Sequence, residues 1–291
     1  MKSRINQISY TFVLPALILY CIFFICPSVQ SFYYALTDWN GFNKEANFIG
    51  LENFFMLSDN TRYLASFENT VKYAFFTSIG QAALGLVLAL LVNMGMRLTA
   101  LYRAVFFAPQ IISLLAVGYI WSYILAPTGA LNLLLERVGL SVLTHNWLGS
   151  LNLALDSIIA FSIWNGAGFC MVVFLANLQG IPQELKEAAE IDGAGAWQKF
   201  WRVTFPLMIP SIMINMITGM IAGFKVYDVV KSTTEGGPGY ATDTITTVMF
   251  DTAFVANRYG EGTAMGITMF VLILLVTIVQ LAFFRRKEVE M

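Results

Sequence analysis

The stretch from Glu184 to Pro210, "ELKEAAEIDGAGAWQKFWRVTFPLMIP", is the most polar long run in a chain of 291 residues that is otherwise rich in apolar segments. A glycine just past a helix end can adopt the left-handed conformation that closes the last turn. Asp192 and Gly193 therefore predict the end of a first short helix. A second short helix follows, and Pro206 returns the chain to an apolar run. The stretch predicts a polar helical connection between two long apolar segments.

The two short helices have different faces. Glu184, Glu187 and Glu190 recur every three residues, so they share one face of the first helix. Trp197 and Trp201 lie four residues apart on the second helix, a spacing typical of a helix at a membrane interface. The simplest interpretation is an amphipathic connector with no further role, and the alternative is a surface that binds a partner.

The composition excludes an ordinary soluble domain, because 57% of the residues are hydrophobic and only 12% are charged. A net charge of -1 without a dense basic run gives no sign of a nucleic-acid partner. Cys21, Cys26 and Cys170 lie in apolar runs, which predicts small core residues rather than disulfides or metal ligands. His145 is the only histidine and falls in a predicted loop. We therefore expect no catalytic residue and no metal site.

Six segments are long enough to cross a membrane as helices. A spanning helix needs about 20 apolar residues, because lipid offers no partner to backbone N–H and C=O groups. The predicted spans are about 10–36, 71–95, 104–126, 154–179, 206–231 and 261–284. We expect an all-α integral membrane protein, a single transmembrane domain over residues 1–291. Its connections include an outer loop, 37–70, and the polar loop 180–205 on the opposite side.

The distribution of Lys and Arg predicts the orientation, because positive residues near span ends stay in the cytoplasm. Of the 17 Lys and Arg residues, ten fall on the side of loop 180–205 and seven at most on the other side. The ten are Lys2, Arg4, Arg97, Arg103, Lys186, Lys199, Arg202, Arg285, Arg286 and Lys287. This bias predicts that both termini and loop 180–205 are cytoplasmic.

Loop 180–205 resembles the EAA loop in the permease subunits of binding-protein-dependent ABC importers. The resemblance is carried by Glu187-Ala188-Ala189, Asp192-Gly193-Ala194, Pro206 and Pro210. In that family the short helix before the glycine is a coupling helix that seats in a groove of a cytoplasmic ATPase subunit. The resemblance implies ATPase coupling by Glu184, Glu187, Ala188, Ala189, Asp192, Gly193 and Ala194.

Three other stretches are similar to the sugar-importer branch, whose members include the maltose and glycerol-phosphate permeases. They are "NFIGLENFFML" (Asn47 to Leu57), "YRAVFFAPQIIS" (Tyr102 to Ser113) and "TEGGPGYAT" (Thr234 to Thr242). The resemblance covers nearly the whole chain. It implies a sugar substrate, an ATPase subunit dimer, a second homologous permease subunit and an extracytoplasmic solute-binding protein. It also implies the cytoplasmic (inner) membrane of a bacterium or archaeon, with lipid around the helices.

The chain lacks the phosphate-loop motif that ATPases use to bind ATP. A phosphate loop requires Gly-Lys followed by Ser or Thr, and Gly-Lys does not occur in the sequence. We expect this chain to bind no cofactor and to rely on ATP and Mg held by a partner ATPase.

Polar residues in the fourth predicted span mark a candidate sugar pathway, because a polar solute needs polar and aromatic groups facing the bundle interior. Ser162, Asn165, Gly166 and Phe169 fall at i, i+3, i+4 and i+7, on one face of a helix. Trp164 is adjacent. By resemblance, the matching turns line the sugar site of the maltose-type permease.

The fifth predicted span has an equivalent stripe that includes Asn215, Gly219 and Gly223. Here the chain departs from the maltose-type permease, which has aromatic and amide residues where this chain has Ala222, Gly223 and Val226. Gly219 and Gly223 also form a small-xxx-small pair, which is typical of close helix packing. We favour packing for the two glycines.

Lys225, Tyr227 and Asp228 lie near the end of the fifth span. A lysine and an aspartate in this position must pair, reach the interface or face water. Their i, i+3 spacing favours an ion pair at the outer mouth, and the alternative is contact with the sugar.

Rival functions remain open. A stand-alone secondary transporter should carry ion-coupling acids within its spans, whereas Asp156 and Asp228, near the ends of the fourth and fifth spans, lie towards the outside. A membrane-embedded enzyme would need a nucleophile and a base, and no such set is present. An ABC permease for another small solute would keep the same loop with a different pocket.

Overall fold

The computed structural model describes residues 13–43, 45–94 and 98–286. Within these ranges the chain is almost entirely helical, with one isolated β-bridge, between Thr37 and Phe48. The α-helices are α2 (Cys26–Tyr34), α3 (Glu52–Asp59), α4 (Thr61–Asn93), α5 (Thr99–Ile111), α6 (Leu114–Ile124), α7 (Ala130–Arg137), α8 (Ala154–Gly180), α9 (Gln183–Ile191), α10 (Ala196–Lys199), α11 (Phe205–Leu207), α12 (Ile209–Phe224), α13 (Asp228–Thr233), α14 (Ile245–Phe250) and α15 (Tyr259–Arg285). Short π-helical turns occur at Cys21–Ile25, Phe200–Thr204 and Asp251–Val255, and a 3-10 turn at Ser141–Leu143.

Four of the described helical segments are long and apolar enough to cross a membrane on their own: Val13–Tyr34, α4, α8 and α15. Two bent pairs also qualify, α5 with α6 at 93° and Ala196–Leu207 with α12 at 61°. If each bent pair is one span, the total is six. The prediction of an all-α membrane protein with about six spans is confirmed.

The segment predicted as one span over 104–126 is divided in the structure. Helix α5 contains Pro109, and Ile112 and Ser113 are extended, with ψ of 134° and 133°. The side chain of Asn165 on α8 donates a hydrogen bond from Nδ2 to the carbonyl oxygen of Pro109, at 2.7 Å. A broken helix within a membrane needs such partners for its backbone groups. The sequence pattern did not show the break, because both halves are apolar.

The segment predicted as one span over 206–231 is also divided. Helix α12 ends at Phe224, and α13 begins at Asp228. The carbonyl oxygen of Val226, in the break, accepts a hydrogen bond from Thr244 Oγ1 at 3.0 Å. Lys225 to Tyr227 therefore form an irregular link between α12 and α13, and a side chain from another segment, Thr244, satisfies its freed carbonyl group.

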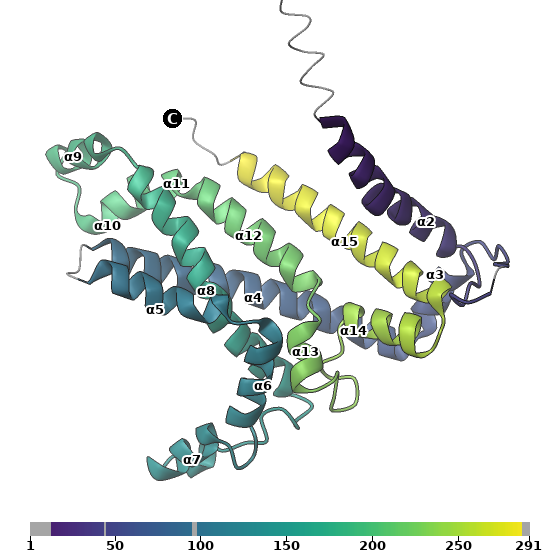
Figure 1. Cartoon of the computed structure of the whole chain (residues 1–291). Helices are drawn as coiled ribbons and strands as arrows, with labels where there is room; N and C mark the ends of the chain where they lie inside the picture. The colour runs from purple at the N-terminus through teal and green to yellow at the C-terminus, as the bar shows by residue number, and fades with distance from the viewer. Residues whose placement is uncertain (1–12, 44, 95–97, 287–291) are drawn as a thin grey trace, which may run out of the picture. The chain divides into compact units, whose positions relative to one another are not determined.

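The chain divides into two compact units, Met1–Thr61 with Val248–Phe270, and Arg62–Thr247 with Val271–Met291. In the second unit, α5 packs against α8 and α6 packs against α13 (Figure 1). The α5–α8 contact is close, because a Cβ added at Gly168 would lie 2.3 Å from the carbonyl oxygen of Phe106. Large side chains such as Phe174, Ile158 and Met171 are fully buried in the two hydrophobic clusters of this unit.

In the first unit, one amide joins the end of α2 to α3. Asn53 is 3% exposed, and its Nδ2 donates to the carbonyl oxygens of Ala35 and Thr37 at 2.8 and 2.9 Å. Tyr34 stacks on Trp39 with ring centroids 4.1 Å apart. These contacts order the loop after α2, as expected for buried polar groups that find partners.

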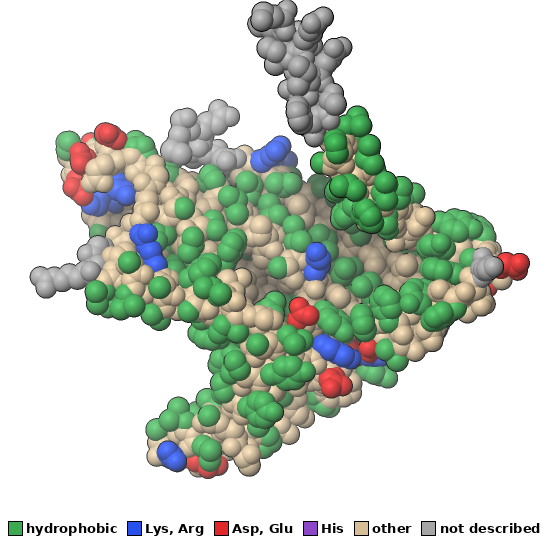
Figure 2. Space-filling model, viewed as in Figure 1, with side chains coloured by type: hydrophobic (Ala, Val, Ile, Leu, Met, Phe, Trp, Pro, Cys, Tyr) green, Lys and Arg blue, Asp and Glu red, His purple; other side chains and the backbone are tan. Residues whose placement is uncertain are grey.

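Apolar side chains cover much of the visible surface (Figure 2). Phe23 and Tyr123, for example, are 75% and 77% exposed. In a membrane such side chains face lipid, so their exposure carries no cost. The same exposure corrects one expectation: Cys170 is buried, but Cys26 is exposed and Cys21 only half-buried, so only Cys170 is a core residue.

The exposed Asp38 offers a test of the first unit. Hydrogen bonds from the side chain of Asn47 and from its backbone N–H hold the pKa of the Asp38 carboxyl below its usual value of 3.8. A depressed pKa means that the ionised carboxylate stabilises the loop above about pH 4, and that this stabilisation is lost as the pH falls through the lowered pKa. Asn47→Ala should raise the pKa of Asp38 towards 3.8. Carboxyl-carbon NMR across a pH titration measures it, and an unchanged pKa in the variant would contradict the assignment.

Candidate functional site

A cavity of about 310 Å³ lies within the second unit, among α4, α5, α6, α8, α12 and the link to α13. Of the residues proposed from the sequence as substrate contacts, all but one line it. They are Ser162, Asn165, Gly166, Phe169, Asn215, Gly219, Gly223, Lys225, Tyr227 and Asp228. The two stripes inferred on the fourth and fifth spans thus meet at one cavity.

Trp164 is the exception. Its indole ring meets that of Trp121 edge-on, with the ring centroids 5.7 Å apart. Both rings line a separate cavity together with Phe161 and Trp147. Successive residues on a helix are rotated by about 100°, so Trp164 cannot share the direction of Asn165. Adjacency in the sequence was therefore a poor guide for this residue.

Helix α4 supplies a wall of the cavity that the sequence analysis missed. Tyr73, Thr77 and Gln81 line it, at intervals of four residues. Polar residues at i, i+4 and i+8 in an apolar run form one stripe, so the signal was present in the sequence. Tyr73 also donates from its hydroxyl to Ser162 Oγ, at 3.0 Å, which joins α4 to α8.

The glycines of the cavity bring helices together. A Cβ at Gly223 would lie 2.6 Å from Cα of Ala74, and one at Gly166 would lie 2.4 Å from Cδ of Gln81. At Gly219 the nearest atom, Cβ of Ser78, would be 3.2 Å away. These short distances agree with the packing interpretation, and the same glycines leave room for the cavity.

The ion pair that we favoured between Lys225 and Asp228 is absent from the described residues. Among the residues that the structure describes, neither Lys225 nor Asp228 forms a salt bridge, and both are exposed at the cavity. The reason is the break after Phe224: Lys225 no longer belongs to the helix that contains Asp228. The i, i+3 geometry on which the expectation rested does not form. The cavity mouth therefore carries one separate charge of each sign.

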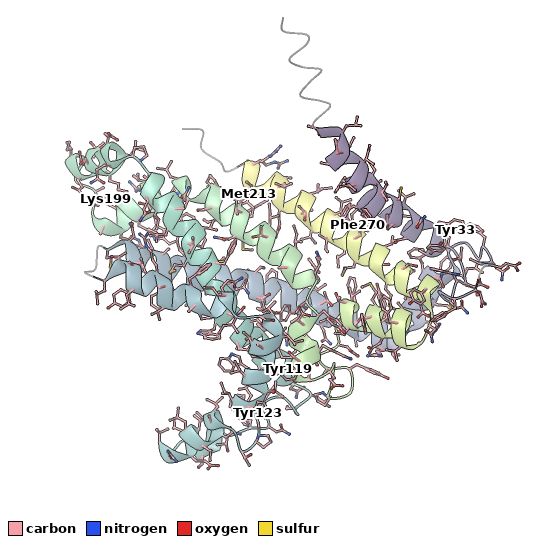
Figure 3. The ribbon with its side chains drawn as sticks, viewed as in Figure 1. Tyr33, Tyr119, Tyr123, Lys199, Met213 and Phe270 are labelled. Atoms are coloured by element: carbon pink, nitrogen blue, oxygen red, sulfur yellow. The ribbon has the colours of Figure 1, made fainter. Side chains whose placement is uncertain are left out.

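The polar loop forms a separate, exposed feature. Helix α9 carries Glu184, Glu187 and Glu190 on its surface, and Figure 2 shows acidic side chains gathered there. Gly193 has φ +77°, and its N–H donates to the carbonyl oxygen of Glu190 at 3.0 Å, which closes the helix as predicted. Glu190 forms an ion pair with Lys199 of α10. Figure 3 labels the position of Lys199.

The remaining coupling candidates also lie on this surface. Glu187, Ala188 and Asp192 are exposed, whereas Ala189 and Ala194 are partly buried. The ring of Trp197 on α10 meets the ring of Trp201, in the turn that follows, edge-on with centroids 5.6 Å apart. Trp197 and Ile191 are 74% and 87% exposed. The loop thus presents acids, small residues and uncovered apolar side chains together.

The connection from 234 to 244 is held rigidly by groups that the sequence analysis did not identify. Asp243 is buried and pairs with Arg62, whose Nε and Nη2 donate to its two carboxylate oxygens at 2.7 and 3.2 Å. Thr247 Oγ1 donates to the same carboxylate at 3.0 Å. Asn69 Nδ2 donates to the carbonyl oxygens of Tyr240 and Asp243. This fixes the loop on the start of α4.

Known proteins share this architecture. The chain is 32% identical to a probable starch degradation products transport system permease protein of Thermoanaerobacterium thermosulfurigenes, over 97% of the chain and 95% of that protein. It is 31% identical to the multiple sugar-binding transport system permease protein of Streptococcus mutans, with 96% of each covered. A crystal structure of a bacterial alginate ABC transporter in complex with an alginate pentasaccharide-bound periplasmic protein matches the fold, with a TM-score of 0.84, 23% identity and coverage of 97% and 96%.

The sequence profile of one family matches residues 81–289, which include the cavity helices α8 and α12 and the whole polar loop. The family is described as the binding-protein-dependent transport system inner membrane component. The match and the relatives agree with the resemblance seen in the sequence. The chain belongs to the family of binding-protein-dependent inner membrane permease components of ABC transporters.

Proposed function

We propose that this chain moves a sugar across the membrane as one permease subunit of an ATP-driven importer. The observation that carries the proposal is a cavity to which otherwise apolar helices contribute several polar side chains, a place where a hydrophilic solute can leave water and keep hydrogen bonds. The relatives named for starch degradation products and multiple sugars support a carbohydrate, including an oligosaccharide.

We infer that α9 is the helix through which ATP hydrolysis by a partner drives transport. An exposed helix with Glu184 and Glu187 on its surface suits a groove lined by basic residues, and Ala188 and Ala189 let it approach closely. We infer that the groove belongs to an ATPase dimer that binds ATP and Mg. Its closure pushes α9, and the turn at Gly193 passes the movement to α12, which lines the cavity. The cavity then opens alternately to each side.

The solute arrives from outside on a solute-binding protein. With α9 in the cytoplasm, we infer that loop 234–244 of the same unit lies on the opposite side of the membrane. The hydrogen bonds and ion pair that fix loop 234–244 make it a suitable docking element. A second, homologous permease completes the complex, as the resemblance to binding-protein-dependent importers implies.

Purification and uptake together test the proposal. The chain is extracted from its native membrane in mild detergent, and the co-purifying polypeptides are identified by mass spectrometry. We expect a phosphate-loop ATPase, a second permease and a binding protein. The complex is reconstituted into proteoliposomes, where some copies have their ATPase subunits facing the lumen. These vesicles should accumulate radiolabelled maltotriose or another oligosaccharide only when ATP is enclosed in the lumen. Uptake driven by a proton or sodium gradient with this chain alone would contradict the proposal.

A further inference from the structure

We propose that a second, apolar cavity in the second unit binds an acyl chain of a membrane phospholipid whose phosphoethanolamine headgroup lies at the rim. The cavity has a volume of about 450 Å³ and lies among α6, α7, α8 and the connection between α7 and α8. The described residues that line it include none of those that line the cavity proposed for the sugar. The inference therefore goes beyond the proposed function and does not depend on which solute the chain moves.

Aromatic rings held by contacts of their own form much of the cavity wall. Trp121 stacks on Phe161 with ring centroids 5.4 Å apart, and Trp164 meets Trp121 edge-on. The indole of Trp147 is fixed by a hydrogen bond from its Nε1 to Oδ1 of the buried Asn132, at 2.9 Å. Because these rings are positioned by one another and by Asn132, the cavity is formed before any ligand enters.

The chemistry of the wall favours a hydrocarbon chain over a sugar or water. Among the described residues of the wall, Asp156 and Ser157 carry the polar side chains other than the indole N–H groups, and both belong to the start of α8. Apolar cavities stay dry, and a sugar in this one would lose most of the hydrogen bonds that it makes in water. An acyl chain has no such groups to satisfy.

The cavity lies on the outward face of α8, where lipid is the surrounding solvent. Asp156, Ala160 and Trp164 line it at intervals of four residues, and all three are exposed. From Asp156 to Trp164 this face extends about 12 Å along the helix, close to the thickness of one hydrocarbon leaflet, about 15 Å. Because α9 follows the other end of α8, the cavity belongs to the half of the membrane farther from α9.

An ion pair at the rim favours one kind of headgroup. Lys72 Nζ on α4 lies 2.6 Å from Oδ1 of Asp156, and the two side chains are 43% and 53% exposed. An ammonium group has three donors and a carboxylate has two acceptor oxygens, so each can bind a further group. Phosphoethanolamine supplies the complementary charges, a phosphate for Lys72 and a primary ammonium for Asp156. An anionic headgroup without an amine would bring its phosphate towards Asp156 uncompensated.

The rim decides which lipid is retained. An acyl chain in a bilayer is already out of water, so entering the cavity gains van der Waals contacts but no hydrophobic free energy. Every phospholipid offers similar acyl chains, and the cavity wall therefore does not distinguish among them. The contacts of Lys72 and Asp156 with the headgroup do.

Photolabelling tests the inference. The chain is purified from its native membrane with the proteins that accompany it and placed in phosphatidylcholine nanodiscs. These contain a phosphatidylethanolamine or a phosphatidylglycerol probe, each with the same diazirine-bearing acyl chain. After irradiation, mass spectrometry maps the adducts. We expect the ethanolamine probe to label peptides that line the cavity about threefold more than the glycerol probe does. Equal or stronger labelling by the glycerol probe would overturn the inference, as would adducts spread evenly over all spans.

Two variants with matched controls assign the labelling to this cavity. Ala160→Phe should reduce it about fivefold, because the added ring occupies the cavity. Ala176→Phe places the same ring on an exposed position of the same helix outside the cavity, and should leave the labelling unchanged. Lys72→Gln should abolish the preference for the ethanolamine probe, whereas Arg137→Gln, at an exposed cation that ends α7, should keep it. Equal effects in a variant and its control would overturn the inference.

The remaining outcomes distinguish the lipid from a protein occupant and from failure of the proposed function. If the cavity is labelled in the isolated chain but not in the purified assembly, a partner protein covers it and the inference fails. Because adducts are measured without solute or ATP, loss of sugar uptake would leave this result unaffected. Specific adducts without any sugar import would support the lipid site and overturn the proposed function alone.

Discussion

Replacing Gly193 by proline is expected to reduce ATP-dependent sugar uptake at least tenfold, to near background. Gly193 has φ +77° and donates its N–H to the carbonyl oxygen of Glu190, and the next N–H, of Ala194, reaches back to Ala189. Proline fixes φ near -65° and has no N–H, so it cannot close α9 in this way. The turn that we propose to transmit ATPase movement would change direction. Vesicle uptake measures the loss, and immunoblotting measures the amount of chain in the membrane.

The chain offers a close control for this change at Gly139, which follows α7. Its φ is +79°, its N–H donates to the carbonyl oxygen of Glu136, and the N–H of Leu140 reaches back to Leu135. Gly139→Pro therefore imposes the same local strain outside the polar loop. We expect uptake in this variant to stay within about twofold of the unmodified chain. A similar collapse of uptake in both variants would show that general strain, rather than coupling, is responsible.

Replacing Gly168 by alanine should lower the free energy of unfolding by about 3 kcal/mol, the upper part of the usual range for overpacking. The added Cβ would lie 2.3 Å from the carbonyl oxygen of Phe106 and 2.9 Å from Cα of Phe107. Both are backbone atoms, so α5 as a whole must move away from α8. The movement would also stretch the hydrogen bond from Asn165 to Pro109 at the break between α5 and α6. Thermal unfolding in detergent measures the effect.

Gly180→Ala is the matched control for Gly168→Ala. Gly180 ends the same helix, and a Cβ there would have no atom within 4 Å. Alanine is the better helix former, so the control should be neutral or slightly stabilising. If Gly168→Ala is as stable as Gly180→Ala, α5 and α8 are not packed as closely as the structure has them.

The fold class could be predicted from the sequence because its signals are local. Apolar length decides which segments cross a membrane, and the four unbroken spans follow from it. The end of α9 at Asp192 and Gly193 follows from the conformational freedom of glycine, which needs no neighbour. The stripe of Ser162, Asn165 and Phe169 on α8 also lines the cavity as inferred, since one helix fixes the relative directions of its own residues.

What lies opposite that stripe was decided by the tertiary structure. Tyr73 and Gln81 of α4 line the cavity opposite it, because the helix that supplies the facing wall depends on how each helix is rotated about its axis relative to its neighbours. Apolar faces are nearly equivalent in lipid, so hydropathy does not specify that rotation. The separation of Lys225 from Asp228 depends in the same way on a helix break, whose freed carbonyl at Val226 is satisfied by Thr244, 18 residues further along the chain. By itself the sequence determined which segments are apolar helices and where the polar loop turns, since both follow from neighbouring residues. The hydrogen-bonding character of the cavity arose only when distant segments packed together.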